Sequence, residues 1–288
     1  MTLLCEDRVV VITGAGRGIG RAHALAFAAA GARVVVNDVS SEAAAEVAAL
    51  IGSRAVVSDD DVSTWAGASA VVSAAVDSFG RLDVLVNNAG IVRDRMIVSG
   101  GEEEWDEVVR VHLKGHFAPL HHAAAYWRGV VKAGGRVSGR VINTSSGAGL
   151  FGSVGQASYS AAKAGIASLT LVAAAELGRY GVTVNAIAPA ARTRMTSSAF
   201  ASMMALPESG FDAMAPENVS PLVVWLGSAE ASDVTGRMFE VDGGRVCVVH
   251  GWRRGDEVDK GERWEVGELG EVVRRLVATD RGVPVYGA

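Results

Sequence analysis

Short runs of β-branched residues alternate with longer alanine-rich runs along most of the chain. Seven of the short runs predict strands: VVVIT (9–13), RVVVND (33–38), AVVS (55–58), LDVLVNN (82–88), GRVINTSS (139–146), VTVNAIA (182–188) and MFEVDG (238–243). Helices are expected between them, near 18–30, 41–51, 65–79, 103–130, 157–179 and 216–229. The strands are continuously apolar, as burial on both faces requires. This alternation predicts an α/β fold: a Rossmann-type, doubly wound parallel sheet of about seven strands with helices on both faces.

The chain contains no linker that would divide it and no internal repeat. Residues 1–244 are therefore expected to form one domain. Beyond them the sequence becomes charged, and apolar residues recur at helical spacing: Leu269, Val272, Val273, Leu276 and Val277. Residues 245–288 are expected to be a C-terminal extension that packs one short amphipathic helix on the same domain.

Composition narrows the classes of function. The 288 residues are 49% hydrophobic and 20% charged, an ordinary globular balance, and the net charge of −5 without a long basic run disfavours nucleic acid as a partner. Cys5 and Cys247 lack the neighbours of a metal site, and so few cysteines are typical of a reducing compartment. No run approaches the roughly 18 apolar residues of a membrane span. We expect a cytoplasmic protein that acts on a small molecule, with no metal and no membrane contact.

A glycine-rich turn, TGAGRGIG, follows the first predicted strand. Backbone N–H groups in such a turn, at the positive end of the next helix, suit a pyrophosphate. The expected cofactor contacts are Gly14, Arg17, Gly18, Ile19 and Gly20, although Ile19 stands where a strict G-x-G-x-x-G would place its last glycine. Arg17 has two interpretations: it meets a phosphate, or it is a solvated loop residue.

Other strands end in polar residues at the same predicted edge. Asp38 ends the second strand, where an acid accepts hydrogen bonds from the ribose 2′-hydroxyl and repels a 2′-phosphate, so NAD is favoured over NADP. Asp61 and Val62 follow the third strand and are expected beside the adenine. The fourth strand leads into the turn Asn88, Ala89 and Gly90, which is expected under a ribose.

The segment GQASYSAAKAG (155–165) carries one phenol, Tyr159, and one amine, Lys163, among small residues. In a helix, residues four apart lie on one face, so the two groups can reach one point. A phenol with a pKa of about 10 is a poor base near neutrality, and an adjacent ammonium favours its phenolate. The pair therefore suits proton exchange with an alcohol or ketone. A surface pair on a small-residue helix is the alternative.

Taken together, these motifs with Ser146 and Asn185-x-x-x-Pro189 resemble the short-chain dehydrogenase/reductase family, in the right order over residues 6–244. The resemblance implies that Tyr159 is the acid/base, that Lys163 assists it and holds the nicotinamide ribose, and that Ser146 polarises the substrate. It also implies cofactor contacts from Pro189 and Thr193, and a homodimer or homotetramer.

One position departs from the family pattern. The family usually has an asparagine in the helix before the fifth strand, where this sequence has His112. The asparagine holds a water that links the lysine to solvent, and an imidazole can do the same; the alternative is that His112 only packs. Histidine here is similar to a narrower subgroup, the (3R)-hydroxyacyl-CoA dehydrogenase part of multifunctional enzyme type 2, also called 17β-hydroxysteroid dehydrogenase type 4.

The resemblance implies an NAD-dependent oxidoreductase that interconverts a secondary alcohol and a ketone, with a 3-hydroxyacyl-CoA favoured as substrate. A carbonyl reductase or hydroxysteroid dehydrogenase acting on a free small molecule is the nearer alternative. A non-catalytic nucleotide-binding regulator is the remote one.

Two loops carry the candidate substrate contacts. Arg93, Arg95, Arg192 and Arg194 are expected beside the mouth of the site, where arginines suit the phosphates of CoA or else pair with nearby acids. Residues 190–215 are rich in methionine, phenylalanine and leucine, which suits a lid over an apolar substrate or core packing equally.

Overall fold

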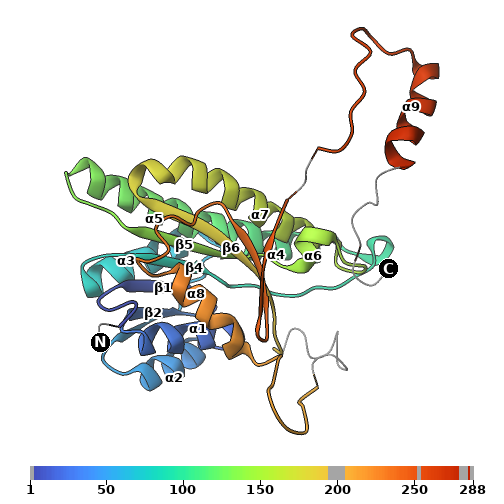
Figure 1. Cartoon of the computed structure of the whole chain (residues 1–288). Coiled ribbons are helices and arrows are strands. Elements are labelled where there is room, and N and C mark those ends of the chain that lie inside the picture. Colours follow the sequence, from blue (N-terminus) through green and yellow to red (C-terminus); the bar gives the residue numbers. More distant parts are fainter. Residues whose placement is uncertain (1–2, 194–204, 252–253, 279–284, 286–288) are drawn as a thin grey trace.

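The computed structural model describes residues 3–193, 205–251, 254–278 and 285, which form one sheet covered by helices on both faces (Figure 1). The strand order in the sheet is β3-β2-β1-β4-β5-β6-β7-β8. The strands are β1 Val9–Thr13, β2 Arg33–Asn37, β3 Ala55–Ser58, β4 Val84–Asn87, β5 Gly139–Thr144, β6 Val182–Ala190, β7 Met238–Asp242 and β8 Arg245–Val249. The doubly wound α/β fold is confirmed.

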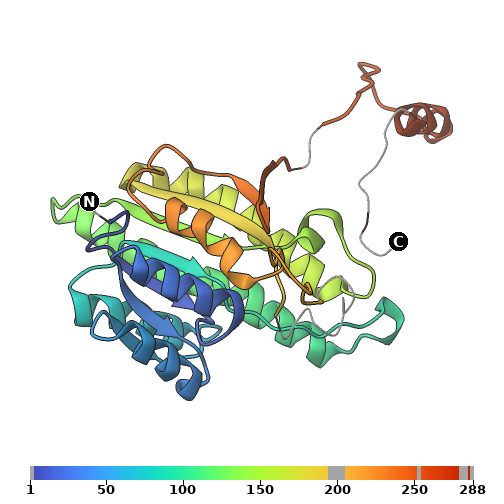
Figure 2. The same ribbon diagram turned by 60° about the horizontal axis from the view of Figure 1, so that its bottom comes forward.

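Two helical layers enclose this sheet (Figure 2). Their members are α1 Gly18–Ala29, α2 Ser41–Ile51, α3 Trp65–Phe79, α4 Glu102–Val109, α5 Gly115–Lys132, α6 Gly147–Phe151, α7 Ala157–Leu177 and α8 Ser220–Leu226. Helices α1, α2 and α8 share a core with one face of the sheet, through residues such as Phe27, Val47 and Val223. Helices α3, α5 and α7 cover the other face, with Trp127 and Leu177 buried there.

The sheet has one strand more than the sequence analysis predicts. β8 pairs antiparallel with β7 in a register that sets Asp242 opposite Arg245, so Gly243 and Gly244 form a two-residue hairpin turn. Gly243 has φ 48°, a conformation that favours glycine, and a Gly-Gly pair between two apolar runs is a hairpin signal. The expectation of about seven strands is therefore corrected to eight in the described part of the chain.

The long helix expected at 103–130 is divided. A π-helical turn at Arg110–Lys114 separates α4 from α5. Such turns contain one extra residue and are often found at functional sites. This turn carries His112, so it determines how that ring is presented to the active site.

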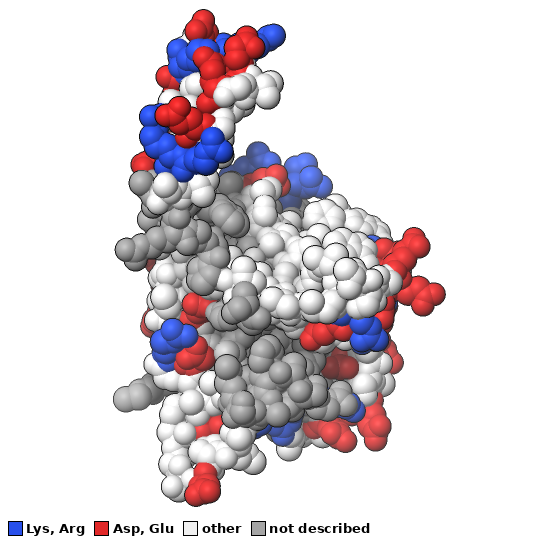
Figure 3. Space-filling model, turned by 90° about the vertical axis from the view of Figure 1, so that its right-hand side faces the viewer, with Lys and Arg blue, Asp and Glu red and all other residues white. Residues whose placement is uncertain are grey.

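The C-terminal extension differs from its prediction. Helix α9, Val266–Ala278, forms where the apolar spacing predicts a helix. None of its residues is buried, however, and it stands away from the sheet (Figures 1 and 2). The chain that leads to it, 254–265, is mostly exposed and polar, so little apolar surface holds α9 against the core. Figure 3 shows acidic and basic side chains crowded on this extension. The expected packing of the helix on the domain is not found.

Candidate active site

The glycine-rich turn is built for close backbone contact at the carboxyl end of β1. Gly14 has φ 63° and Gly18 has φ 53°, conformations that side chains disfavour. A Cβ on Gly20 would collide with the carbonyl oxygen of Gly14, so the turn folds directly onto the start of α1. The first turn of α1 has no acidic residue and no side-chain cap. Its N–H groups therefore fit a pyrophosphate.

Asp38 is held by backbone groups at the end of β2. Its Oδ2 accepts from the N–H of Gly16 at 3.0 Å, and its Oδ1 accepts from the N–H of Ser40 at 3.0 Å. The carboxylate thus lies against the glycine-rich turn, where it can accept hydrogen bonds from a ribose hydroxyl. Arg17, in the same turn, is exposed.

The stretch after β3 also fits its predicted place. Val62 is buried, while Asp61 accepts from the backbone and hydroxyl of Ser63 at 2.9 and 2.6 Å and from Arg110 at 3.1 Å. These hydrogen bonds outweigh partial burial and lower the pKa of Asp61. Arg110 lies on the π-helical turn, and the sequence analysis missed it because no motif links it to a residue so far back in the chain.

The turn after β4 is fastened to β1. The hydroxyl of Thr13 accepts from the N–H groups of Asn88 and Ala89 at 2.9 and 3.0 Å. The Asn88 amide donates to the carbonyl of Thr13 at 3.0 Å. A Cβ on Gly90 would lie 2.5 Å from Cε1 of His112, so glycine is needed where that ring packs.

Ser146, Tyr159 and Lys163 come together beyond the end of β5. Ser146 caps α6 and hydrogen-bonds with Tyr159, while Nζ of Lys163 donates to the carbonyl of Thr144 at 2.6 Å and lies 5.6 Å from the Tyr159 ring centroid. Lys163 is 2% exposed. A Cβ on Gly149 would lie 2.6 Å from Cβ of Lys163, so this glycine lets α6 pack directly on α7. The helix places phenol and amine on one side, as their spacing predicts.

The pKa values of Tyr159 and Lys163 differ from the expectation that an adjacent ammonium lowers the pKa of the phenol. Burial raises the pKa of Tyr159; hydrogen bonding with Ser146 opposes this rise and the negative charge of Asp94 adds to it. Burial also lowers the pKa of Lys163 to about 7. Lys163 therefore carries less than a full positive charge near pH 7. Burial thus weakens the stabilisation of the Tyr159 phenolate that the sequence predicts from an adjacent ammonium.

His112 reaches the site from the π-helical turn. Its Nε2 lies 2.6 Å from the carbonyl oxygen of Ile91, and its ring meets the Tyr159 ring edge-on at 5.2 Å between centroids. Burial, with the nearby charge of Lys163, lowers the pKa of His112 to about 3, so the imidazole is neutral. Its Nδ1 has no hydrogen-bond partner within the described ranges.

The later motif divides between structure and site. Asn185 donates to the carbonyl of Val234 at 2.7 Å and accepts from the N–H of Arg237 at 3.1 Å, so it joins β6 to the chain before β7. Pro189 lies at the carboxyl end of β6. Thr193 lies against Gly18: a Cβ added to Gly18 would be 3.3 Å from the Thr193 methyl group. Thr193 therefore faces the start of α1.

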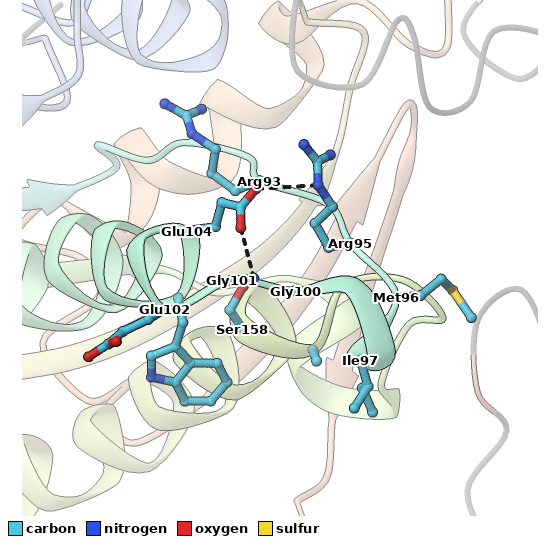
Figure 4. A pocket seen from close by; sticks show the side chains of 11 residues that line it. Arg93, Arg95, Met96, Ile97, Gly100, Gly101, Glu102, Glu104 and Ser158 are labelled. Carbon is cyan, nitrogen blue, oxygen red and sulfur yellow. Dashed lines mark hydrogen bonds and ion pairs between the residues drawn. The ribbon is translucent and has the colours of Figure 1, made fainter.

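The candidate substrate arginines are paired with acids. Arg93 makes two hydrogen bonds to Glu107, at 2.8 and 3.1 Å, and Arg95 pairs with Glu104 at 3.3 Å (Figure 4). Arg192 forms an ion pair with Asp212. Arg194 lies outside the described residues. Arg93, Arg95 and Arg192 therefore each pair with a nearby acid, which is the alternative to phosphate binding that the sequence leaves open.

Two adjoining pockets lie between the 93–101 loop and the start of α7. One, of about 280 Å³, is lined by Arg93, Arg95, Met96, Ile97, Gly100, Gly101, Glu102, Glu104, Trp105, Ala157 and Ser158 (Figure 4). The other, of about 430 Å³, is mainly apolar and includes Val98, Val154 and Val285. Both are close to Tyr159 along α7.

The segment expected to form a lid is described only in part. Leu206 and Phe211 are 72% and 67% exposed, so they do not pack in the core. Met214 is half-buried. Met195, Phe200, Met203 and Met204 lie outside the described residues.

A contact near Tyr159 joins the 93–101 loop to the start of α7. The side-chain amide of Gln156 donates to both carboxylate oxygens of Asp94 at 3.1 Å, and the N–H of Arg95 donates to the carbonyl of Gly155 at 2.8 Å. These bonds fasten the 93–101 loop to the start of α7 and bring the charge of Asp94 near Tyr159. No motif in the sequence signals this pairing.

The fold and this arrangement define the class of protein. The short chain dehydrogenase family model matches residues 8–203, so the chain belongs to that family and is a short-chain dehydrogenase/reductase enzyme. Enzymes of this family use NAD or NADP.

Named relatives refine the comparison. The chain is 47% identical to the hydroxyacyl-CoA dehydrogenase ChsB1 of Mycobacterium tuberculosis, over 95% of this chain and 89% of that one. It is 41% identical to mouse peroxisomal multifunctional enzyme type 2, over 94% of this chain and 34% of that longer protein. A crystal structure of a short chain dehydrogenase from Mycobacterium avium superposes with a TM-score of 0.91 at 61% identity, covering 99% of this chain and 100% of that one. The subgroup resemblance of the sequence analysis is confirmed.

Proposed function

We propose that this enzyme uses NAD to interconvert the secondary alcohol and the ketone of a 3-hydroxyacyl-CoA. The observation that carries the proposal is the convergence of Ser146 and Lys163 on Tyr159, beside the glycine-rich turn at one sheet edge. The names of the two relatives, a hydroxyacyl-CoA dehydrogenase and a peroxisomal multifunctional enzyme, support this substrate class.

The chain's own residues handle the proton. In alcohol oxidation, the Tyr159 oxygen accepts the proton of the substrate hydroxyl while Ser146 hydrogen-bonds to the same substrate oxygen. Nζ of Lys163 lies 5.6 Å from the centroid of the Tyr159 ring, and in its protonated form it would favour the phenolate, whereas burial and the charge of Asp94 oppose it. Bound oxidised nicotinamide supplies the hydride acceptor and a further positive charge. Ketone reduction runs the proton transfer in reverse.

Asp38 supports NAD as the cofactor. Its carboxylate is fixed from two sides by backbone N–H groups, so it would meet a 2′-phosphate with negative charge in the space of the ribose hydroxyls. Arg17 is the competing feature, because its guanidinium could neutralise that phosphate.

The apolar pocket beside α7 supports an acyl substrate. Val98, Val154 and Met96 line it, and Ser160, the neighbour of Tyr159, stands at its wall. The pocket is lined by residues on both sides of Tyr159 along α7, Ala157 and Ser160, although Tyr159 itself does not line it. The same apolar lining keeps the alternative of a free steroid or other lipid alcohol open.

The CoA portion is tested by removing its phosphates. We expect the parent enzyme to have a higher kcat/KM for a 3-hydroxyacyl-CoA than for the matching pantetheine thioester. If Arg192 exchanges its ion pair with Asp212 for a CoA phosphate, Arg192→Ala should lower only the CoA value, and added salt should shrink that loss, because phosphate contacts are screened. If the parent treats both thioesters alike, a free alcohol or steroid becomes the better substrate.

A homodimer or homotetramer is the proposed assembly. Leu171 and Val172 on α7 and Phe117 on α5 are 57%, 51% and 45% exposed, which is unusual for large apolar side chains on adjacent helices. Sedimentation of the parent and of Leu171→Glu tests whether this face joins subunits.

By length and composition, Ala157–Tyr180 could also cross a membrane, but it packs on the sheet and carries the buried Lys163, as core helices do.

A further inference from the structure

An ion pair joins two parts of the cofactor-binding edge that lie far apart in the sequence. Nη1 of Arg110, on the π-helical turn, donates to Oδ2 of Asp61 at 3.1 Å and also to the hydroxyl of Ser63. These two partners follow β3, 49 and 47 residues earlier in the chain. The turn that carries His112 is thereby fastened to the loop that is expected beside the adenine. No step of the proposed reaction uses this contact.

The loop around Asp61 leaves the backbone of this residue little freedom. Its carbonyl oxygen accepts from the N–H and the hydroxyl of Thr64 at 3.0 and 2.8 Å, and the same hydroxyl caps α3 by accepting from the N–H of Gly67 at 3.0 Å. A Cβ on Gly67 would lie 2.3 Å from the Asp61 carbonyl oxygen, so α3 begins directly against this residue. The side-chain torsions of Asp61 are therefore the main freedom that remains to be fixed.

The Asp61 carboxylate has room for one more hydrogen-bond donor. A carboxylate offers about four lone-pair positions, two on each oxygen. Oδ1 accepts from the N–H and the hydroxyl of Ser63 at 2.9 and 2.6 Å, which uses both of its positions. Oδ2 accepts from Arg110, which leaves one position open among the contacts of the described residues. The side chain is 43% exposed, so a ligand can reach this position from solvent.

An amino group is the ligand that suits the open position. Burial raises the pKa of Asp61, but the hydrogen bonds from Ser63, together with the hydrogen bond and charge of Arg110, outweigh burial and lower it below its usual value. The carboxylate is therefore ionised near neutrality, and an ionised acceptor makes the stronger hydrogen bond. The exocyclic amine of adenine is a donor, whereas the oxygen at the same place in hypoxanthine is an acceptor. A correctly turned carboxylate would distinguish these two bases.

We propose that Arg110 is a positioning residue for cofactor binding, which turns the Asp61 carboxylate towards the adenine amine and so joins the adenine end of the site to the π-helical turn. Arg110 binds Asp61 and Ser63 at once, and this fixes the direction of Oδ2. The side chains of Arg110 and Asp61 are 44% and 43% exposed, so their pair adds little to stability and acts mainly on orientation. The inference rests on the dinucleotide part of the proposed function and on no particular substrate. NAD and NADP share the adenine, so it does not depend on Asp38 either.

The direct test compares two reduced dinucleotides that differ at the adenine amine: NADH, and reduced nicotinamide hypoxanthine dinucleotide, in which an oxygen replaces that amine. Nicotinamide fluorescence gives the Kd of each for the free enzyme. The parent should bind NADH about tenfold more tightly, as a hydrogen bond to a charged group implies. Arg110→Met, which keeps the length of the side chain but neither its charge nor its donors, should reduce this ratio by about threefold or more. General loosening of the site would weaken both dinucleotides and leave the ratio unchanged.

Two comparisons show whether Arg110 acts through Asp61. Asp61→Ala should itself remove most of the preference for NADH, and adding Arg110→Met to it should then change the ratio by less than about twofold. Arg33 supplies the matched control, because it is also 44% exposed and pairs with Asp7 at 3.2 Å, but at the amino end of β2, away from the cofactor edge. Arg33→Met should keep the parent ratio. Arg110→Lys, which retains the charge without the planar group, should recover part of it.

Three results would overturn the proposal. A parent that binds the two dinucleotides equally would show that Asp61 does not accept from the adenine amine. An unchanged ratio in Arg110→Met would make Arg110 a structural residue only, and a larger ratio would show that it competes with the adenine for Asp61. Should Arg110→Met fail to fold, Arg110→Ala takes its place in the same comparison.

A second readout tests the link to the π-helical turn. ADP carries the adenine but no nicotinamide, so in the parent it should slow amide hydrogen exchange at Arg110–Lys114, because a carboxylate held by the ligand also restrains its arginine. At equal ADP occupancy, Arg110→Met should lose this protection, and equal protection in both proteins would overturn the link. An enzyme that prefers NADH in this way but oxidises no 3-hydroxyacyl-CoA would contradict the proposed function and still support the role of Arg110.

Discussion

The nucleotide-binding half and the substrate-facing half of the sheet edge are held by different contacts. In the first, backbone N–H groups hold the polar side chains: Gly16 and Ser40 hold Asp38, and the Asn88 turn holds Thr13. In the second, side chains neutralise one another, as Arg95 does with Glu104. A site made of backbone contacts tolerates little change, whereas exposed ion pairs are worth at most about 1 kcal/mol each and can be exchanged.

This difference indicates which parts of the site serve the binding of a dinucleotide and which parts can change with the substrate. The glycine-rich turn and Asp38 present a rigid surface to a dinucleotide. The 93–101 loop, joined to α7 through Asp94 and Gln156, can change its pairings without disturbing the sheet. Sequence changes in the second half should therefore alter substrate preference more readily than cofactor binding.

The largest effect is expected where the two halves meet, at Tyr159. Tyr159→Phe removes only the hydroxyl, so NADH affinity should stay within about twofold while kcat falls by about 10² to 10⁴, the usual contribution of a positioned acid/base. Stopped-flow turnover with NADH binding measured in parallel checks both values. Activity within about tenfold of the parent would assign the proton to another group.

Within the nucleotide half, Gly20→Ala should be the most damaging small change. Its Cβ would meet the Gly14 carbonyl oxygen and the Asn88 amide, both parts of the fastened turn. We expect NADH affinity to fall by about tenfold or more, corresponding to about 1.4 kcal/mol. Gly129→Ala, where a Cβ meets nothing within 4 Å, is the matched control and should bind normally. Equal affinities in the two variants would contradict a tightly built turn.

Asp38 should set the cofactor preference. Asp38→Ala removes the acceptor for the ribose hydroxyls and the repulsion of a 2′-phosphate, so the ratio of kcat/KM for NAD to that for NADP should fall by about tenfold. Steady-state kinetics with both cofactors measures this ratio. A parent enzyme that prefers NADP would show that Arg17 outweighs Asp38.

In the substrate half, the smallest effect is expected at Arg95. Because Arg95 and Glu104 are both at least partly exposed, Arg95→Ala should change the free energy of unfolding by less than about 1 kcal/mol and kcat/KM by less than about threefold. Chemical denaturation and steady-state kinetics give these values. A loss of more than tenfold confined to the CoA substrate would mean that Arg95 leaves Glu104 to bind phosphate.

The same contrast explains what the sequence could predict. The seven parallel strands and the glycine-rich turn follow from local patterns, because apolar runs and glycine at positive φ leave few alternatives. The ion-pair partners of Arg93 and Arg95 come from α4, and only the folded chain shows how close they lie. The π-helical turn likewise has no simple signal, so the burial of His112 and His116 could not be read from spacing. Amphipathic spacing predicted α9 but not where it would lie.

The proposed reaction is oxidation of the 3-hydroxyl of an acyl-CoA with NAD. The most direct measurement is NADH formation by the purified enzyme with NAD and a series of 3-hydroxyacyl-CoA substrates, compared with free secondary alcohols and hydroxysteroids. We expect at least one acyl-CoA to have the highest kcat/KM in the set, and Tyr159→Phe to lower its turnover by about 10² to 10⁴. NADH formation from a free steroid or alcohol alone, with no acyl-CoA oxidised, would contradict it.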